Sequence, residues 1–312
     1  MTITVLNAAL KPLLEGRLPD WVEPRWYASK DEVLALAPQA EIGWYDMYTK
    51  ADVIRAVTRS ERLRWLNTGF AGLDWFPLDW MAERGVRLTN GAGINAITIA
   101  EYVVMGMLSF AKDYPAVLAG QARGEWLKDS PGKRELFESR ALILGAGAIG
   151  QEIAVRLAAF GVEVTKVRRT PGAGELGPDE WRARLGQFDW VILAVPQTPE
   201  TEHMIGADEL AAMKADAVLL NIARGGVVDQ DALVAALQER RIGGAFLDVT
   251  TPEPLPAGHP LWTMDNAVIT MHLSGRAQTR MYERCAQRFL RDLPRFRSGE
   301  PMESEVDLAR GY

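Results

Sequence analysis

The sequence predicts an α/β protein made of two doubly wound parallel sheets. Short apolar runs rich in β-branched residues alternate with segments of helical periodicity along most of the chain, a pattern typical of parallel sheets flanked by helices. These strand–helix units form two separate series, one on each side of a long helical pattern that starts near residue 95. The length of 312 residues also suggests about two domains.

Composition and charge exclude several other classes of protein. The 41 acidic and 35 basic side chains give a net charge of −6, so we expect neither nucleic acid nor a membrane as partner. Cys285 is the single cysteine and only three histidines are present, which excludes an intrachain disulfide and a cysteine-based zinc site, and no metal-binding spacing appears. We expect no metal. The N-terminus does not resemble a signal peptide, so we expect a cytoplasmic protein.

The first series contains four predicted strands and two predicted helices. The strands cover 3–6, 41–45, 64–68 and 86–88, and the helices cover 50–57 and 79–84. From residue 95 to about residue 118, apolar side chains recur at helical spacing and predict one long helix, which Pro115 is expected to end or kink. A polar connection over 120–138 follows, and a connection of this length inside a domain is usually functional.

The second series has the content of a complete dinucleotide-binding domain of the Rossmann type. Its six predicted strands cover 141–144, 162–167, 190–194, 218–222, 244–248 and 267–270. Helices are predicted between them at 148–160, 208–213 and 229–240, and a last amphipathic helix at 278–296. We therefore expect two Rossmann-like sheets, the second one larger than the first.

A glycine-rich turn between the first strand and the first helix of this second series predicts nucleotide binding. Gly145 permits the tight turn, Gly147 lets the backbone approach a pyrophosphate, and Gly150 lets the helix pack closely on the strand. The helix N-terminus offers N–H groups and a positive dipole end to the phosphates. The predicted phosphate contacts are Gly145, Ala146, Gly147, Ala148, Ile149 and Gly150.

The end of the next strand favours NADP(H) over NAD(H). NAD-binding proteins commonly place an acidic residue there for the ribose 2′-hydroxyl, whereas this strand ends in Arg168, Arg169 and Thr170. Two guanidinium groups and a hydroxyl suit a 2′-phosphate. A solvated basic turn remains the alternative, in which case NAD(H) would also bind.

Three further strand ends carry side chains suited to keto-acid chemistry. Arg224 can bind a carboxylate through two hydrogen bonds, and His272 can exchange a proton with a carbonyl or hydroxyl oxygen near neutral pH. Glu253 can accept a hydrogen bond from the other ring nitrogen of a histidine and so fix its tautomer. Ligands of doubly wound sheets bind at the carboxyl ends of strands, where all three lie.

Four motifs together resemble the D-isomer-specific 2-hydroxyacid dehydrogenase family, and they occur in the family's order. They are GAGAIG at 145–150, NIARGGVVD at 221–229, DVTTPEPLP at 248–256 and MHLSG at 271–275, with further similar segments at 70–74 and 90–101. Thr250 and Met271 depart from the aromatic residue and the proline usual there. Neither departure removes a reacting group.

The resemblance implies roles for the candidate residues. Arg224 would bind the substrate carboxylate and polarise the carbonyl, His272 would protonate the carbonyl oxygen, and Glu253 would pair with His272. Backbone amides around Ala71 and Gly72 would hold the carboxylate from the other domain. The further cofactor contacts predicted here are Val195, Pro196, Ile222, Ala223, Asp248, Ser274 and Gly275.

The resemblance also implies an organisation. Residues 1–95 plus 285–312 would form a flavodoxin-like substrate-binding domain, residues 96–284 the dinucleotide-binding domain, and the active site would lie in the cleft between them. Family members dimerise through the cofactor domains, so we expect a homodimer. Trp126 resembles a tryptophan that enters the neighbouring subunit's site in some reductases, although ten tryptophans leave other candidates.

We therefore expect an NADPH-dependent oxidoreductase that reduces small 2-keto acids such as glyoxylate and hydroxypyruvate to 2-hydroxy acids. The strand end at 168–170 and the closing segment 306–312 are similar to the type A group of NADPH-preferring glyoxylate/hydroxypyruvate reductases. One alternative is a 3-phosphoglycerate-type dehydrogenase or another family member using NAD. The other is a non-catalytic co-repressor that senses a dinucleotide, because a fold does not fix a function.

Overall fold

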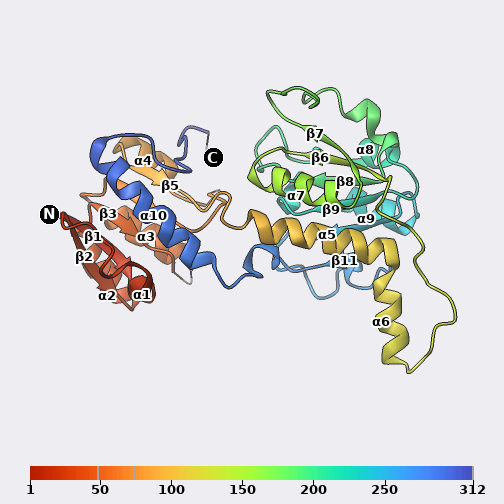
Figure 1. Ribbon diagram of the computed structural model, residues 1–312, viewed down its shortest axis with the longest axis horizontal. Coiled ribbons are helices and arrows are strands. Elements are labelled where there is room, and N and C mark those ends of the chain that lie inside the picture. Colours follow the sequence, from red (N-terminus) through yellow and green to blue (C-terminus); the bar gives the residue numbers. More distant parts are fainter. Residues whose placement is uncertain (48, 74, 311–312) are drawn as a thin grey trace. The chain divides into compact units, whose positions relative to one another are not determined.

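The chain folds into two compact units in the computed structural model, which describes residues 1–47, 49–73 and 75–310 (Figure 1). The first unit comprises residues 1–95 and the chain from Gln278 onward, and the second comprises residues 96–277. The expected return to the first unit at residue 285 falls inside helix α10 (Met281–Ser298). This helix packs as a whole in the first unit, so the crossing precedes it at Gln278.

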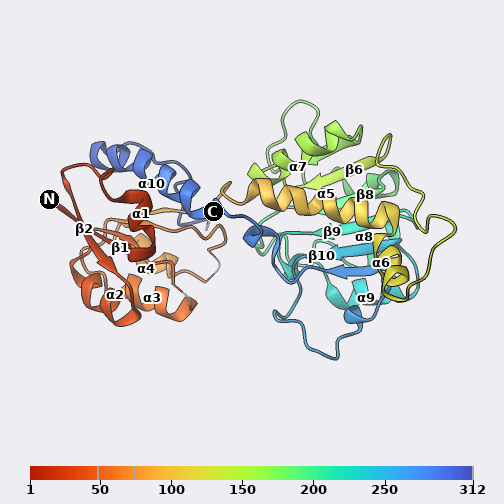
Figure 2. The same cartoon turned by 60° about the horizontal axis from the view of Figure 1, so that its bottom comes forward.

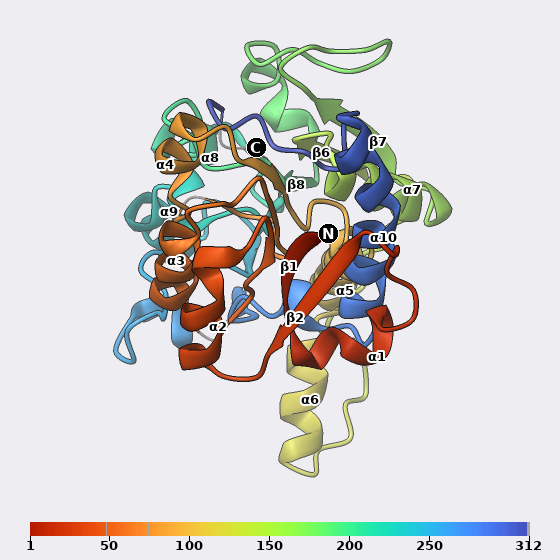
Figure 3. The ribbon, with the colours of Figure 1, turned by 90° about the vertical axis from the view of Figure 1, so that its left-hand side faces the viewer.

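The first unit is a five-stranded parallel sheet with the order β2-β1-β3-β4-β5. Its strands are β1 (Thr2–Asn7), β2 (Val22–Tyr27), β3 (Ile42–Trp44), β4 (Trp65–Asn67) and β5 (Arg87–Thr89). Its helices are α1 (Lys11–Leu14), α2 (Lys30–Leu36), α3 (Lys50–Arg59), α4 (Leu78–Glu83) and α10. Figure 3 shows α1 and α10 on one side of the sheet and α2 and α3 on the other, and each side encloses its own apolar core.

Strand β2 is missing from the sequence prediction. Its sequence carries Glu23, Pro24 and Arg25, which interrupt the apolar pattern expected of a buried strand. The strand nevertheless pairs with β1 along its full length, at the edge of the sheet. An edge strand tolerates proline because one row of its backbone groups faces away from the sheet.

The second unit is a six-stranded parallel sheet with the order β11-β10-β9-β8-β6-β7. Its strands are β6 (Arg140–Leu144), β7 (Glu163–Val167), β8 (Trp190–Leu193), β9 (Val218–Asn221), β10 (Gly244–Leu247) and β11 (Ala267–Ile269). Its helices are α5 (Ala96–Lys112), α6 (Tyr114–Ala122), α7 (Ala148–Ala159), α8 (Ala207–Ala212) and α9 (Gln230–Gln238). Helices α5 and α7 cover one face and α9 the other (Figure 2).

The long helix predicted from residue 95 to about residue 118 is two helices. Helix α5 ends at Lys112, and α6 begins at Tyr114 with Pro115 in its first turn. Asp113 between them has a φ of 45°, a left-handed conformation that ends the first helix. The kink expected at Pro115 therefore lies before it, and α6 stands away from the sheet of its own unit (Figure 1).

The two parallel sheets confirm the fold class predicted from the sequence. The six strands expected in the second series coincide with β6 to β11 to within a residue at each end. Because all six run parallel, their carboxyl ends share one edge, and the predicted site segments of this unit follow those ends. Across residues 1–47, 49–73 and 75–310, no helix is both long and apolar enough to cross a membrane.

The core beneath α10 gives a first prediction. Phe289 is fully buried and its ring stacks on Trp65 with a centroid distance of 4.9 Å. Phe289→Ala should lower the free energy of unfolding by about 3–5 kcal/mol, because it leaves a cavity between the helix and the sheet. Urea denaturation would measure the change. Tyr282→Ala on the same helix, where the ring is half exposed, is the control, and an equal loss in both variants would contradict the prediction.

Candidate active site

The glycine-rich turn lies between β6 and α7 and is tightly constrained at two glycines. Gly145 has a φ of +104°, and a Cβ atom there would lie 2.4 Å from the carbonyl oxygen of Ala194. A Cβ atom on Gly150 would lie 2.1 Å from the carbonyl oxygen of Gly145. Both positions therefore require glycine, because no side chain could fit without moving backbone.

The same turn leaves room for a phosphate group. A Cβ atom on Gly147 would meet no atom within 4 Å, so the backbone there is open to an approaching ligand. Gly147 is the N-cap of α7, and no side chain caps this helix end. The first N–H groups of α7 and the positive end of its dipole thus fit a dinucleotide pyrophosphate.

An acidic side chain that the sequence pattern does not predict lies beside the basic strand end after β7. Arg168, Arg169 and Thr170 are exposed, but the segment beyond them folds back, with Arg168 N–H donating to the Leu176 carbonyl over 3.0 Å. This places the partly buried Glu175 carboxylate 3.0 Å from Lys166 Nζ and 3.9 Å from Arg168 Nη1. The Gly172 amide, then Lys166 and Arg168, hold the pKa of Glu175 below its usual value.

Glu175 could not be found from sequence spacing. An acidic residue that binds the ribose is expected at the end of the strand itself. Glu175 lies well beyond that position in the sequence. The Arg168 side chain is still half exposed when it pairs with Glu175. Its guanidinium N–H groups can therefore still donate hydrogen bonds to a ligand. The loop fold that creates the pair depends on backbone bonds between 166–168 and Leu176.

The three candidate catalytic residues come together at the carboxyl ends of β9, β10 and β11. The Nδ1 atom of His272 lies 2.8 Å from Oε2 of Glu253, and the side chains are 43% and 38% exposed. Arg224 follows β9, its carbonyl accepts a hydrogen bond from the Asn221 amide group, and its Nη1 donates to the Ala223 carbonyl over 2.8 Å. These are contacts within one unit.

Electrostatics couple the three side chains. Burial works to raise the pKa of Glu253, but the hydrogen bond and charge of His272, the Thr250 amide and the charge of Arg224 together hold it below its usual value. Glu253 therefore stays ionised near neutral pH and accepts the Nδ1 proton of His272. This leaves Nε2 of the imidazole as the atom that can give a proton to a ligand.

The turn that carries His272 is fixed by a buried carboxylate. Asp248 is 2% exposed, and its Oδ1 accepts hydrogen bonds from the Thr270 hydroxyl and the amides of Leu273 and Ser274. The Ser274 hydroxyl donates to Oδ2, and the amide of His272 donates to the Asp248 carbonyl over 2.6 Å. Met271 and His272 both have positive φ values, 53° and 57°, which are uncommon for such residues and are held by this network.

The first unit, taken by itself, carries the predicted amide loop after β4. Ala71 is exposed and Gly72 is partly exposed. Within the described part of the chain, neither amide N–H has a hydrogen-bond acceptor. Asp74, the last residue of the similar segment at 70–74, lies outside the described residues, as do Gly311 and Tyr312 of the closing segment 306–312.

The other predicted residues occupy different surroundings. Ile222, Ala223 and Ser274 are buried, whereas Pro196 is exposed and Val195 partly exposed at the end of β8. Gly275 follows Ser274 in the short 3₁₀ turn Ser274–Arg276, directly after the turn that Asp248 holds. Trp126 is 92% exposed and lines a cavity of about 750 Å³ beside α6, on the connection that the sequence analysis marks as functional.

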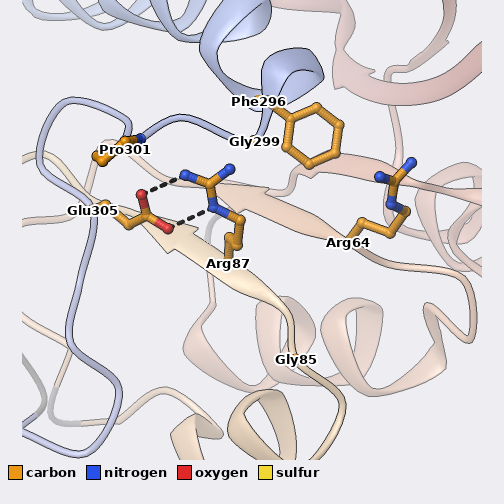
Figure 4. A pocket seen from close by; sticks show the side chains of 7 residues that line it. All are labelled: Arg64, Gly85, Arg87, Phe296, Gly299, Pro301 and Glu305. Atoms are coloured by element: carbon orange, nitrogen blue, oxygen red, sulfur yellow. Dashed lines mark hydrogen bonds and ion pairs between the residues drawn. The ribbon is translucent and has the colours of Figure 1, made fainter.

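A second cavity, of about 510 Å³, lies in the first unit at the amino ends of β4 and β5 (Figure 4). Its lining includes Arg64, Arg87, Phe296 and Glu305. The Nε and Nη2 atoms of Arg87 each donate a hydrogen bond of 2.6 Å to the Glu305 carboxylate. Figure 4 shows this pair. The cavity lies at the opposite end of these strands from the amide loop and contains no predicted site residue.

Comparison with known proteins agrees with these features. The family model for the NAD binding domain of D-isomer specific 2-hydroxyacid dehydrogenases matches residues 104–274. The human glyoxylate reductase/hydroxypyruvate reductase is 35% identical over 260 residues, which cover 79% of this chain and 77% of that protein. A D-3-phosphoglycerate dehydrogenase of Methanocaldococcus jannaschii is 32% identical over 254 residues, 78% of this chain and 47% of that protein.

A solved structure extends the similarity over the whole chain. A D-isomer specific 2-hydroxyacid dehydrogenase from Xanthobacter autotrophicus Py2, in complex with NADPH and MES, has a TM-score of 0.79 and 28% identity, with 100% of this chain and 99% of that chain covered. The fold and the glycine-rich turn thus define an NAD(P)-binding oxidoreductase. The chain belongs to the D-isomer specific 2-hydroxyacid dehydrogenase family.

The Glu253–His272 pair predicts a pH-dependent stability. Because the pKa of Glu253 is lowered from 4.5, its ionised form stabilises the fold above that value, and this contribution is lost as the pH falls through the lowered pKa. The wild type should be more stable than Glu253→Gln near neutral pH, and the difference should shrink as the pH falls below 4.5, the ordinary pKa of the carboxyl, and through its lowered pKa in the fold. Denaturant unfolding at several pH values would measure it, with the exposed Glu61→Gln as control. A difference that does not change with pH would contradict the prediction.

Proposed function

We propose that this protein is an NADPH-dependent reductase of small 2-keto acids, with glyoxylate and hydroxypyruvate as the leading substrates. The observation that carries the proposal is the Arg224–Glu253–His272 cluster at one edge of a dinucleotide-binding sheet. Arginine suits the carboxylate of a keto acid, and a histidine paired with a carboxylate suits proton donation to its carbonyl oxygen. The name of the human relative, glyoxylate reductase/hydroxypyruvate reductase, supports this substrate class.

Each residue of the cluster has a distinct task in this proposal. Arg224 binds the substrate carboxylate and orients the keto group. His272 donates a proton from Nε2 to the carbonyl oxygen, while Glu253 holds Nδ1 and stabilises the imidazolium before transfer. A bound nicotinamide coenzyme would supply the hydride. The amides of Ala71 and Gly72 in the first unit provide the second contact for the substrate carboxylate.

The coenzyme preference rests on the strand end after β7. Arg168 and Arg169 present guanidinium groups that match a 2′-phosphate, and no acidic residue occupies the end of the strand itself. Glu175 beside Arg168 offsets part of this positive charge, so NADH would still bind, more weakly than NADPH. The NADPH complex of the relative from Xanthobacter autotrophicus Py2 supports binding of this coenzyme.

Loss of the proton donor should abolish most of the activity. His272→Asn should lower kcat by about 10²- to 10⁴-fold with keto acid and NADPH, because the imidazole proposed to protonate the carbonyl oxygen is removed. Its φ of 57° favours asparagine as the replacement. His203→Asn, at a φ of 49° in the same unit, is the matched control. Steady-state NADPH oxidation and the NADPH dissociation constant would be measured. Near-wild-type kcat in His272→Asn would refute the assignment.

Removal of the two arginines after β7 should change the coenzyme preference. In the double variant Arg168→Ala/Arg169→Ala, the dissociation constant of NADPH should rise about 10- to 100-fold, since charge-assisted hydrogen bonds to the 2′-phosphate are lost. That of NADH should change by less than about threefold. Nicotinamide fluorescence would measure both, with Arg240→Ala, an exposed partner of Asp265, as control. Equal weakening of both coenzymes would contradict the 2′-phosphate contact.

A homodimer through the second unit is also part of the proposal. The described part of this unit exposes a set of large apolar side chains on α5, α6, α7 and the connections around them: Met105, Tyr114, Val117, Leu118, Trp126, Phe137, Val155 and Phe160. Exposed large apolar side chains, aromatic ones above all, are enriched at protein interfaces. A second copy would cover it, and Trp126 would then approach the partner's site.

Light scattering should therefore give twice the chain mass of 34.5 kDa. Leu118→Asp should shift the equilibrium towards the single chain, because a charge would be buried at the interface. Leu273→Asp, at another exposed apolar residue of the same unit, is the control and should remain dimeric. A wild-type protein with the mass of one chain would contradict the proposal.

A further inference from the structure

A carboxylate lies directly beneath the amide loop of the first unit. Asp46 follows β3, and its Oδ2 accepts hydrogen bonds from Trp44 Nε1 over 2.8 Å and from the Gly69 amide over 2.7 Å. Its Oδ1 accepts one from the Thr68 hydroxyl over 2.5 Å. The Trp44 ring is fully buried against Phe289. Asp46 therefore links the start of the loop to a rigid part of the core.

The rest of the loop is held from the segment after β5. The Phe70 carbonyl accepts a hydrogen bond from the Gly91 amide over 2.8 Å, and the Ala71 carbonyl accepts one from the Asn90 side chain over 3.0 Å. The Phe70 amide donates to the Thr68 hydroxyl oxygen over 3.2 Å. The loop backbone is thus bonded at Gly69, Phe70 and Ala71, and in the described chain the amides of Ala71 and Gly72 are left for a ligand.

The Asp46 carboxyl accepts its hydrogen bonds from neutral donors. Burial raises the pKa of Asp46 above its usual value, although the Thr68, Gly69 and Trp44 donors act to lower it. The nearby Cys285 stays a neutral thiol, because burial, and then the charge of Asp46, raise its pKa to about 12. A negative charge beside a site for a substrate carboxylate would by itself repel the substrate. Asp46 can therefore assist substrate binding through its hydrogen bonds to the loop, and not through its charge.

We propose that Asp46 is a positioning residue, which fixes the loop at Thr68 and Gly69 so that the amides of Ala71 and Gly72 receive the substrate carboxylate. This inference rests on the proposed function, because it concerns the second contact of the same substrate. Asp46 does not touch the substrate; it acts through the backbone that does. Its loss should weaken binding of the carboxylate more than it slows the chemical step.

Asparagine and alanine at this position distinguish positioning from charge. In Asp46→Asn, the amide oxygen can accept from Trp44 and Gly69, and the amide nitrogen can donate to the Thr68 hydroxyl, which both donates and accepts. The loop contacts survive while the charge is lost. In Asp46→Ala all three contacts are lost, while the loop keeps its hydrogen bonds to Asn90 and Gly91 and the bond from the Phe70 amide to Thr68.

The experiment compares Asp46→Ala and Asp46→Asn with Asp292→Ala. Asp292 is a fully buried aspartate on α10 of the same unit, bonded to the Glu303 amide and Arg295, and is the control for general destabilisation. Each full-length protein is measured for KM and kcat with hydroxypyruvate, for the dissociation constant of oxalate in the presence of NADPH, for NADPH affinity, and for Tm.

Asp46→Ala should raise KM and the oxalate dissociation constant about 10- to 100-fold, with kcat changed less than about threefold and NADPH affinity unchanged. Asp46→Asn should recover most of this loss, and Asp292→Ala should lower Tm without the selective rise in KM. The inference is overturned if Asp46→Ala keeps the wild-type KM, or if Asp46→Asn is as impaired as Asp46→Ala. A wild type that binds NADPH but neither reduces a keto acid nor binds oxalate refutes the proposed function, and this inference with it.

Discussion

The parallel alignment of the six strands in the second unit is the constraint on which its candidate site depends. Parallel strands place all their carboxyl ends at one edge of the sheet. The phosphate-binding turn, Arg224, Glu253 and His272 therefore share that edge, although they lie far apart along the chain. The alignment is maintained by apolar strands buried on both faces, which form separate cores under α5 and α7 and under α8 and α9.

Local hydrogen bonds then fix the conformation of the turns that carry the candidate site residues. The buried carboxylate of Asp248 gathers the hydroxyls and amides of 270–274, which offsets the cost of burying its charge and fixes the turn that carries His272. In the first unit, Asp46 does the same for the loop at Thr68 and Gly69. In each unit, one carboxylate accepts hydrogen bonds from neutral donors and so holds a nearby segment of backbone. Asp248 holds the turn at 270–274, and Asp46 holds the loop that begins at Thr68.

The sequence predicted the features that depend on local pattern. The strands β6 and β8 to β11 are largely apolar runs, β7 contains two β-branched valines and a threonine, and the positions of Gly145 and Gly150 admit no other residue. Features set by contacts between distant segments were not predictable. They include β2, whose proline is tolerated only at a sheet edge, the end of α5 at Asp113, and the approach of Glu175 to Arg168 through a loop that folds back. No spacing rule identifies Asp46, because the loop residues that it binds, Thr68 and Gly69, come from another strand end.

Hydride transfer from NADPH to the keto carbon of a small 2-keto acid is the reaction that we propose for this protein. The most direct measurement uses NADPH deuterated at the transferred position of the nicotinamide, with hydroxypyruvate or glyoxylate, and determines the product by mass spectrometry and NMR. We expect one deuterium on carbon 2 of the hydroxy acid for each NADPH oxidised. Oxidation of NADPH that leaves the product unlabelled, or binding of NADPH without conversion of any 2-keto acid, would contradict it.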